Sequence, residues 1–213
     1  MISITRLPEP ARLTKNKEKW RAAFLEKRKN KPGSRPNSRQ YGHPEIRKAL
    51  RAMSFHKCFY CERKLVGKGE VDHYIEIAKD PTLAFEWSNL YLSCPECNDK
   101  LPSIPVSDCL DPCNSENPAE HLTFDREVIR PKANSSKGSK TVQKYQLDRE
   151  NLNYIRSRQL HKFRDALAAL REHQIRDGGR PPTQSEKEVL TSFAQPDHAF
   201  SLMFSTYLAK LDL

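Results

Sequence analysis

The sequence has few apolar residues and no long run of them. Hydrophobic residues make up 37% of the 213 residues and charged residues 30%, which describes a chain with a large wetted surface. No stretch approaches the ~18 apolar residues that a membrane-spanning helix requires. The opening MISITRLPEPARL lacks an apolar run followed by a small-residue cleavage site, so we expect no signal peptide. The expected location is therefore the cytoplasm, and the sequence contains no internal repeat.

Four of the six cysteines come in two pairs of the form Cys-x-x-Cys. Disulfide bonds are not expected in a reducing cytoplasm, and all six cysteines lie within 56 residues. Zinc takes four thiolates in a tetrahedron, and such pairs present them two at a time. We therefore predict a structural Zn²⁺ site formed by Cys58, Cys61, Cys94 and Cys97. A redox dithiol is less favoured because neither pair follows a βαβ pattern.

The other two cysteines, Cys109 and Cys113, lie in the segment DCLDPCNSENPAEH. They could join His121 in a second metal site, although the spacing is unusual. The alternative is that they are free thiols that pack locally. The sequence leaves the role of these three residues open.

Charge divides the chain into three regions. Residues 1–55 hold 15 Lys and Arg against 4 Asp and Glu, residues 56–130 hold 8 against 14, and residues 131–213 hold 14 against 9. Basic flanks suit a polyanion such as nucleic acid, and an acidic middle suits a hard cation. Solvated lysines or an acidic protein partner would explain the flanks equally well, so charge alone does not decide.

Helical patterns occupy both flanks, and only brief strands and a short helix fit in the middle. Apolar spacing predicts five helices, at 15–29, 43–55, 149–177, 184–194 and 197–211. The longest has Asp148 as its expected N-cap, and Gly178 follows its end. The basic stretch KRKNKPGSRPNSR at 27–39 is expected to be a loop. The apolar stripe of the last helix indicates core or a docking face for a partner.

Between the cysteine pairs the chain carries polar residues suited to phosphodiester hydrolysis. That reaction needs a base to activate water, a cation to stabilise charge, and a group that orients the base. His73 titrates near neutral pH and suits the base. Asp72 and Asn98 offer oxygen ligands for a divalent cation, and Asn89 could fix the loop that positions the histidine. Each of these residues alone would be ordinary, and only their combination indicates phosphodiester hydrolysis.

At these residues the sequence resembles an HNH nuclease, the ββα-metal finger, in a zinc-stapled form with Asn in place of the final His. The match places Asp72 and His73 at the first H, Asn89 at the central N and Asn98 at the last position, with CFYC and CPECN as the zinc knuckles. The resemblance implies an α+β fold with a small ββα core. It also implies His73 as general base, Asn89 as its orienting residue, and a catalytic Mg²⁺ or Mn²⁺ on Asp72 and Asn98.

A narrower resemblance reaches beyond this core. The segments LDPCNSENPAEHLTFD and QLDRENLNYIRSRQ, and the opening MISITRLPEP, are similar to the PtuB-like HNH subunits of Septu-type anti-phage systems and of retrons carrying the same pair. This resemblance implies an effector nuclease with an ABC/SMC-like ATPase partner (PtuA-like). His121 matches the group's pattern and would contact substrate or be structural.

We therefore predict three regions: a basic N-terminal helical region (1–55), a zinc-stapled HNH nuclease core (56–130) and a C-terminal helical region (131–213). The predicted activity is metal-dependent cleavage of nucleic acid, with DNA favoured. Lys79, Lys100 and the N-terminal basic segment are candidate phosphate contacts. One alternative is the same chemistry on RNA, for instance tRNA. Another is a zinc-dependent nucleic-acid-binding module without catalysis.

Overall fold

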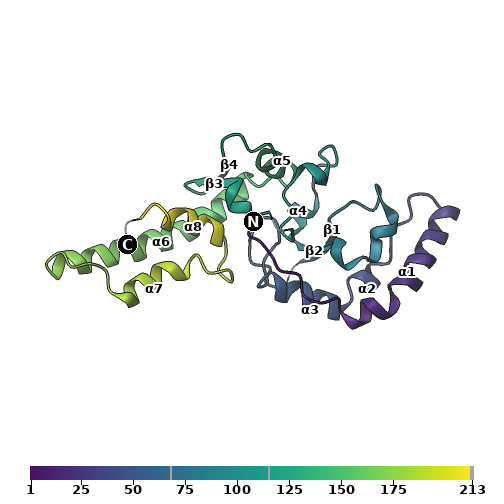
Figure 1. Ribbon diagram of the computed structural model, residues 1–213, viewed down its shortest axis with the longest axis horizontal. Coiled ribbons are helices and arrows are strands. Elements are labelled where there is room, and N and C mark those ends of the chain that lie inside the picture. Colours follow the sequence, from purple (N-terminus) through teal and green to yellow (C-terminus); the bar gives the residue numbers. More distant parts are fainter. Residues whose placement is uncertain (68, 115, 212–213) are drawn as a thin grey trace.

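The computed structural model describes residues 1–67, 69–114 and 116–211. Figure 1 shows an elongated molecule with N-terminal helices at one end, C-terminal helices at the other and two small sheets between them. This arrangement confirms the predicted α+β class with a small core between flanking helices. Within the described ranges, no helix combines the length and the apolar character needed to cross a membrane.

The N-terminal region folds as three helices, α1 (Ala11–Asn30), α2 (Ser38–Tyr41) and α3 (Pro44–Met53). The predicted helices at 15–29 and 43–55 are confirmed, and α1 begins one turn earlier than expected. The predicted loop at 27–39 is wrong at both ends, because α1 continues to Asn30 and α2 begins at Ser38. Three basic residues in the last turn of α1 face its negative dipole end, which favours this extension.

The middle of the chain holds a ββα unit. Strands β1 (Glu70–His73) and β2 (Leu90–Ser93) pair antiparallel, and the short helix α4 (Pro95–Asn98) follows β2 directly. Pro95 occupies the first helical position, where its missing N–H costs nothing. The connection between the strands contains two 3-10 turns, Pro81–Phe85 and Trp87–Asn89. The predicted brief strands and short helix are confirmed.

A second hairpin and a helix follow that the sequence patterns did not indicate. Strands β3 (Leu122–Asp125) and β4 (Val128–Pro131) form the hairpin, and α5 (Ser136–Lys144) packs against β4. Ser135 caps α5 by accepting a hydrogen bond from the backbone of Gly138. These elements link the ββα unit to the C-terminal helices.

The long helix α6 (Glu150–Arg176) confirms the prediction except at its start. Its N-cap is Arg149, so the expected cap at Asp148 is wrong. The backbone of Arg149 is non-helical, with φ −59° and ψ 146°, so the first helical residue is Glu150. The Arg149 guanidinium contacts the cysteine sulfurs. The helix ends before Gly178 and Gly179, which both adopt the positive φ angles that glycine tolerates.

Two shorter helices, α7 (Gln184–Ser192) and α8 (Ser201–Leu208), pack with α6. Phe204 of α8 lies 5.4 Å from the ring of Phe163 in α6, and Met203 is fully buried, so this part of the predicted stripe is core. Residues 212–213 of the predicted last region lie outside the described residues. One cluster of buried side chains joins the three predicted regions, whose boundaries stay a prediction.

Candidate active site and metal centre

Four buried cysteine side chains converge at one point. The sulfurs of Cys58, Cys61, Cys94 and Cys97 all lie within 4.8 Å of one another, and the Cys61 and Cys94 sulfurs are 3.8 Å apart. Four sulfurs at zinc-bond length from one ion lie ~3.8 Å apart. The cluster therefore fits a tetrahedral zinc ion. No other group of three or more His, Cys, Asp or Glu side chains in the described part of the chain could share an ion.

Arg149, which directly precedes α6, contacts the four-cysteine cluster. Its guanidinium donates to the sulfur of Cys97 at 3.6 Å and to that of Cys94 at 3.7 Å. A zinc ion with four thiolates carries a net negative charge, which is costly to bury without a counter-charge. Arg149 supplies that positive charge and ties the cluster to the start of α6. Nothing in the local sequence around Arg149 indicated this role.

His73 ends β1, and its ring is held on two sides. Nε2 lies 2.9 Å from the carbonyl oxygen of Ala84, and the ring of Tyr41 contacts the imidazole edge-on at 4.6 Å between centroids. A carbonyl only accepts hydrogen bonds, so Nε2 carries the proton and Nδ1 keeps its lone pair. Burial lowers the pKa of His73 to about 4, against the opposing effect of the Ala84 carbonyl, and Lys100 lowers it further. The imidazole is therefore neutral at pH 7.

Asn89 lies buried beneath His73 and joins the two segments that hold it. Its side-chain oxygen accepts from the Ile75 amide at 2.7 Å, and its amide donates to the carbonyls of Ile75 and Leu83 at 3.1 and 3.2 Å. Ile75 follows β1 closely, and Leu83 precedes Ala84, whose carbonyl contacts the imidazole. These bonds hold in place the predicted loop, while a contribution of Asn89 to catalysis stays a prediction.

Asp72 points to the opposite side of β1 and is paired with a buried lysine. Both of its carboxylate oxygens lie 2.8 Å from Nζ of Lys100, and the Tyr60 hydroxyl donates to one of them at 2.7 Å. Burial raises the pKa of Asp72, and Lys100 opposes that rise. Lys100 also donates to the backbone carbonyl of His73. Lys100 is thus buried and engaged with β1, which rules out a solvated lysine, while its predicted phosphate contact stays a prediction.

Asn98 is the last residue of α4 and lies one position after Cys97. Its amide nitrogen donates to a carboxylate oxygen of Glu70 at 2.6 Å. Its side-chain carbonyl oxygen has no hydrogen-bond partner among the described residues and remains available as a ligand. Because α4 is anchored by the second cysteine pair, the position of Asn98 depends on the cluster.

A cleft of about 440 Å³ brings three of the predicted site residues together. Asp72, His73 and Asn98 all line it, whereas Asn89 and the four cysteines do not. The cleft is also lined by residues from outside the ββα unit, namely Arg28, Arg35 and Tyr41. The sequence patterns identified Asp72, His73 and Asn98 as site residues but gave no indication of Tyr41.

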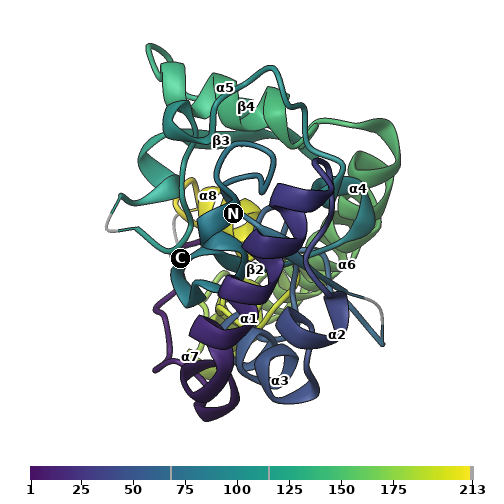
Figure 2. The same cartoon turned by 90° about the vertical axis from the view of Figure 1, so that its right-hand side faces the viewer.

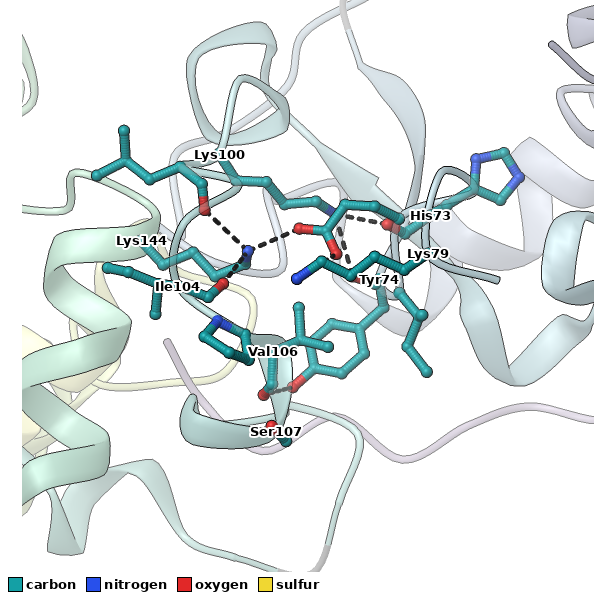
Figure 3. Close-up of polar contacts among 12 residues, drawn as sticks. His73, Tyr74, Lys79, Lys100, Ile104, Val106, Ser107 and Lys144 are labelled. Carbon is teal, nitrogen blue, oxygen red and sulfur yellow. Dashed lines mark hydrogen bonds and ion pairs between the residues drawn. The ribbon is translucent and has the colours of Figure 1, made fainter. Parts of the chain in front are cut away.

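Buried Lys144 and half-buried Glu76 form a second ion pair beside Asp72 and Lys100. Lys144 is fully buried in α5 and donates to Glu76 at 2.7 Å and to the carbonyls of Leu101 and Ile104 at 3.1 and 2.7 Å. Figure 3 shows the ends of the Lys100 and Lys144 side chains approaching each other, while the His73 imidazole points away from them. Neither residue was predicted, because the pairing joins positions 68 residues apart.

The remaining cysteines and His121 do not form a second cluster within the described residues. The Cys109 thiol contacts the Pro105 carbonyl, and burial raises the pKa of both Cys109 and Cys113 to about 11. His121 lies 3.0 Å from Glu116 and 2.8 Å from the Ser135 hydroxyl. The structure thus favours the alternative of free thiols that pack locally.

Residues 58–103, which contain both cysteine pairs and the ββα unit, match the family described as HNH endonuclease. The chain carries an HNH endonuclease domain. This confirms the resemblance drawn from Asp72, His73, Asn89 and Asn98. The HNH domain includes the four-cysteine cluster and the part of the cleft formed by β1 and α4, while α1 and α2 lie outside the matched residues.

Two curated proteins are distant relatives of the chain. It is 33% identical over 103 residues to the Septu protein PtuB of Bacillus thuringiensis, covering 47% of this chain and 37% of that protein. It is 29% identical over 153 residues to the Septu protein PtuB of Bacillus mycoides (strain KBAB4), covering 55% of this chain and 52% of that protein. The chain thus spans between about a third and a half of the length of these relatives.

Proposed function

We propose that this protein is a metal-dependent endonuclease that hydrolyses phosphodiester bonds of nucleic acid, with DNA as the favoured substrate. The HNH domain supports this class of activity. The state of His73 carries the proposal. Its Nε2 proton is held by the Ala84 carbonyl and burial lowers its pKa to about 4, so a neutral imidazole with a free Nδ1 lines the cleft at pH 7.

In this proposal His73 accepts a proton at Nδ1 from the water that attacks the scissile phosphate. The Ala84 carbonyl then stabilises the imidazolium through the bond that it already makes to Nε2. Asn89 keeps that carbonyl at the right distance, because it binds the chain on both sides of the imidazole. Asn89 is therefore a positioning residue, and His73 is the catalytic base.

The proposed catalytic cation is Mg²⁺ or Mn²⁺, which would stabilise charge on the phosphorane and on the leaving 3′ oxygen. Asp72 and Asn98 are the residues proposed to hold it, because both line the cleft and both carry oxygen donors. Mg²⁺ usually keeps several waters and takes one or two protein groups besides substrate phosphates, so two side chains suffice. The Lys100 ammonium opposes the rise that burial causes in the pKa of Asp72. Because Nζ lies 2.8 Å from both carboxylate oxygens, Lys100 would have to move aside for Asp72 to bind the cation.

We also propose that Zn²⁺ is the ion of the four-cysteine cluster and that its role is structural. The spacing of the sulfurs supports this, and four sulfurs leave no open coordination position. The helix that begins within the second cysteine pair ends at Asn98. The structural ion would thus fix one ligand of the catalytic cation.

The substitution His73→Ala tests the base. It should abolish nicking of plasmid DNA in Mg²⁺ or Mn²⁺, because it removes Nδ1, the proposed proton acceptor. Zinc content and melting temperature should stay near those of the unaltered protein. His161→Ala, an exposed histidine of α6, is the matched control and should cleave normally. Cleavage that survives in His73→Ala would refute the base assignment.

The same assay separates the alternatives. A purified chain that binds nucleic acid but cleaves neither DNA nor RNA in either cation would support a zinc-dependent binding module. Cleavage of RNA alone would keep the chemistry and change the substrate.

The similarity to two Septu PtuB proteins supports the Septu resemblance. On that resemblance we propose a role in anti-phage defence with a PtuA-like ABC/SMC ATPase as partner. Co-expression of the chain with an ATPase encoded beside its gene should yield a complex that survives size-exclusion chromatography. A chain that stays alone and has full nuclease activity would contradict regulation by such a partner.

A further inference from the structure

The N-terminal helices contact the very loop that holds His73. Trp20 and Phe24 of α1 pack against Phe85, with ring centroids 5.8 and 6.3 Å apart. Phe85 follows Ala84, whose carbonyl contacts the imidazole. Figure 2 looks at the molecule from this end and shows α1 in front of β2. Since Tyr41 of α2 contacts His73 as well, residues outside the HNH domain form part of the cleft.

The end of α1 directs two arginines to this cleft. Phe24 and Arg28 are four residues apart on one helix face, so a buried Phe24 places Arg28 one turn further along the same side. The chain then reverses at Gly33, whose φ of +87° strains any other residue. The hydroxyl of buried Ser34 donates to the Lys31 carbonyl at 2.8 Å and fixes the turn. Arg35 follows, and both arginines line the cleft.

These two arginines are the charges of the cleft that stay uncompensated. The carboxylate of Asp72 is paired with Lys100, and that of Glu76 with Lys144. By contrast, neither Arg28 nor Arg35 has an ion-pair or hydrogen-bond partner among the described residues.

Some other cations of α1 are paired: Lys17 and Arg21 with Glu86, and Lys29 with Glu26. What distinguishes Arg28 and Arg35 is that they line the cleft without an ion-pair partner among the described residues.

We propose that Arg28 and Arg35 bind the backbone phosphates of the nucleic-acid strand that enters the cleft beside His73. The N-terminal region is then the second wall of the active site. This inference rests on the proposed function for the identity of the polyanion. A guanidinium presents paired N–H donors that match phosphate oxygens, and it stays charged at all working pH values. Backbone contacts of this kind bind without reading sequence.

The test is binding by the full-length, zinc-loaded chain carrying His73→Ala, so that cleavage does not interfere. Fluorescence anisotropy is measured with a labelled DNA duplex, the corresponding single strand and an RNA of the same sequence, between 50 and 200 mM KCl. Adding Arg28→Gln and Arg35→Gln should weaken binding roughly tenfold for each guanidinium removed. The slope of log affinity against log salt should fall by about 0.7 to 0.9 for each phosphate that is no longer bound.

The matched control carries Arg158→Gln and Arg171→Gln, two exposed arginines of α6, and removes the same charge elsewhere. It should keep both affinity and slope. The affinity of a variant with Arg28→Lys and Arg35→Lys should lie between that of the Arg28→Gln and Arg35→Gln variant and that of the control. It retains the charge without the paired donors. If the two Gln pairs have equal effects, the weaker binding reflects net charge alone and the inference is overturned.

Cleavage by chains with His73 intact separates this inference from the proposed function. A protein that cleaves, and whose affinity and KM are unchanged by the Arg28 and Arg35 substitutions, keeps the function and overturns the inference. A protein that never cleaves, but loses binding only through these two arginines, supports the phosphate-binding wall and refutes the nuclease.

Discussion

At the scale of single residues, the environment of His73 decides its protonation. An exposed histidine would be largely protonated at pH 6, whereas burial lowers the pKa of His73 to about 4. The Ala84 carbonyl fixes the tautomer and the Tyr41 ring fixes the plane of the imidazole. A base held in this way is ready without any rearrangement.

This environment predicts an unusual pH profile. The single-turnover cleavage rate at pH 6.0 should stay close to that at pH 7.5, since His73 remains neutral, whereas an unperturbed histidine would lose ~4-fold. The rate should fall only as pH approaches 4. A rate that already falls with a midpoint near 6.5 would contradict the buried, neutral base.

The same shift affects stability. The folded pKa lies below the ordinary value, so the unfolded chain binds a proton more readily between pH 6.5 and about 4. The free energy of unfolding should therefore decrease as pH falls through this window, by on the order of 3 kcal/mol. Carboxylates that become protonated add to the loss of stability at the acidic end. The free energy of unfolding is therefore compared with that of His73→Ala, which lacks the histidine contribution.

At the scale of elements, Arg149 connects the long helix to the cysteine cluster. It precedes the first residue of α6 and donates to the sulfurs of Cys94 and Cys97. The cluster, in turn, anchors α4 and hence Asn98. The long helix α6 is thus linked to the proposed cation site through the side chain of Arg149.

Arg149→Leu should weaken zinc binding by roughly 10- to 100-fold, as loss of a side chain that bonds a metal ligand usually does. The negative charge of the four thiolates would lose its nearby cation. Competition with a colorimetric chelator measures the affinity. Arg149→Lys should be intermediate, and Arg158→Leu on the same helix is the control. Equal zinc affinities for Arg149→Leu and the control would contradict this role.

At the scale of the whole molecule, two metals are expected to serve separate purposes. The cysteine cluster lies in the buried core that joins all three parts of the chain. The proposed Mg²⁺ or Mn²⁺ lies in an open cleft lined by Asp72 and Asn98. Removal of each ion should therefore have a different consequence.

A brief treatment with EDTA should remove the cation of the cleft and stop cleavage, with the melting temperature almost unchanged and activity restored by Mg²⁺. Stripping the cluster with a strong zinc chelator should cause cooperative unfolding, because binding of structural zinc is coupled to folding. Circular dichroism and the fluorescence of Trp87, which is buried, follow the transition. A stripped chain that keeps its fold and melting temperature would refute structural zinc.

The sequence by itself determined what depends on local spacing. Two Cys-x-x-Cys pairs specified the cluster, the order Asp72, His73, Asn89 and Asn98 specified the HNH domain, and regular apolar stripes specified the long helices. These features are readable because each cysteine pair and each apolar stripe lies within one turn or helix, and because the four HNH residues and the two pairs follow one another in a fixed order along the chain.

Only the tertiary structure decided which distant side chains meet. The pairs Asp72–Lys100 and Glu76–Lys144, and the contact of Arg149 with the cysteines, join segments that the path of the chain brings together. The same is true of Arg28 and Arg35, which looked like part of a basic loop and instead line the cleft. Burial and pairing are set by the whole fold, so a lysine or arginine in the sequence does not reveal whether its charge is neutralised inside the protein or left for a ligand.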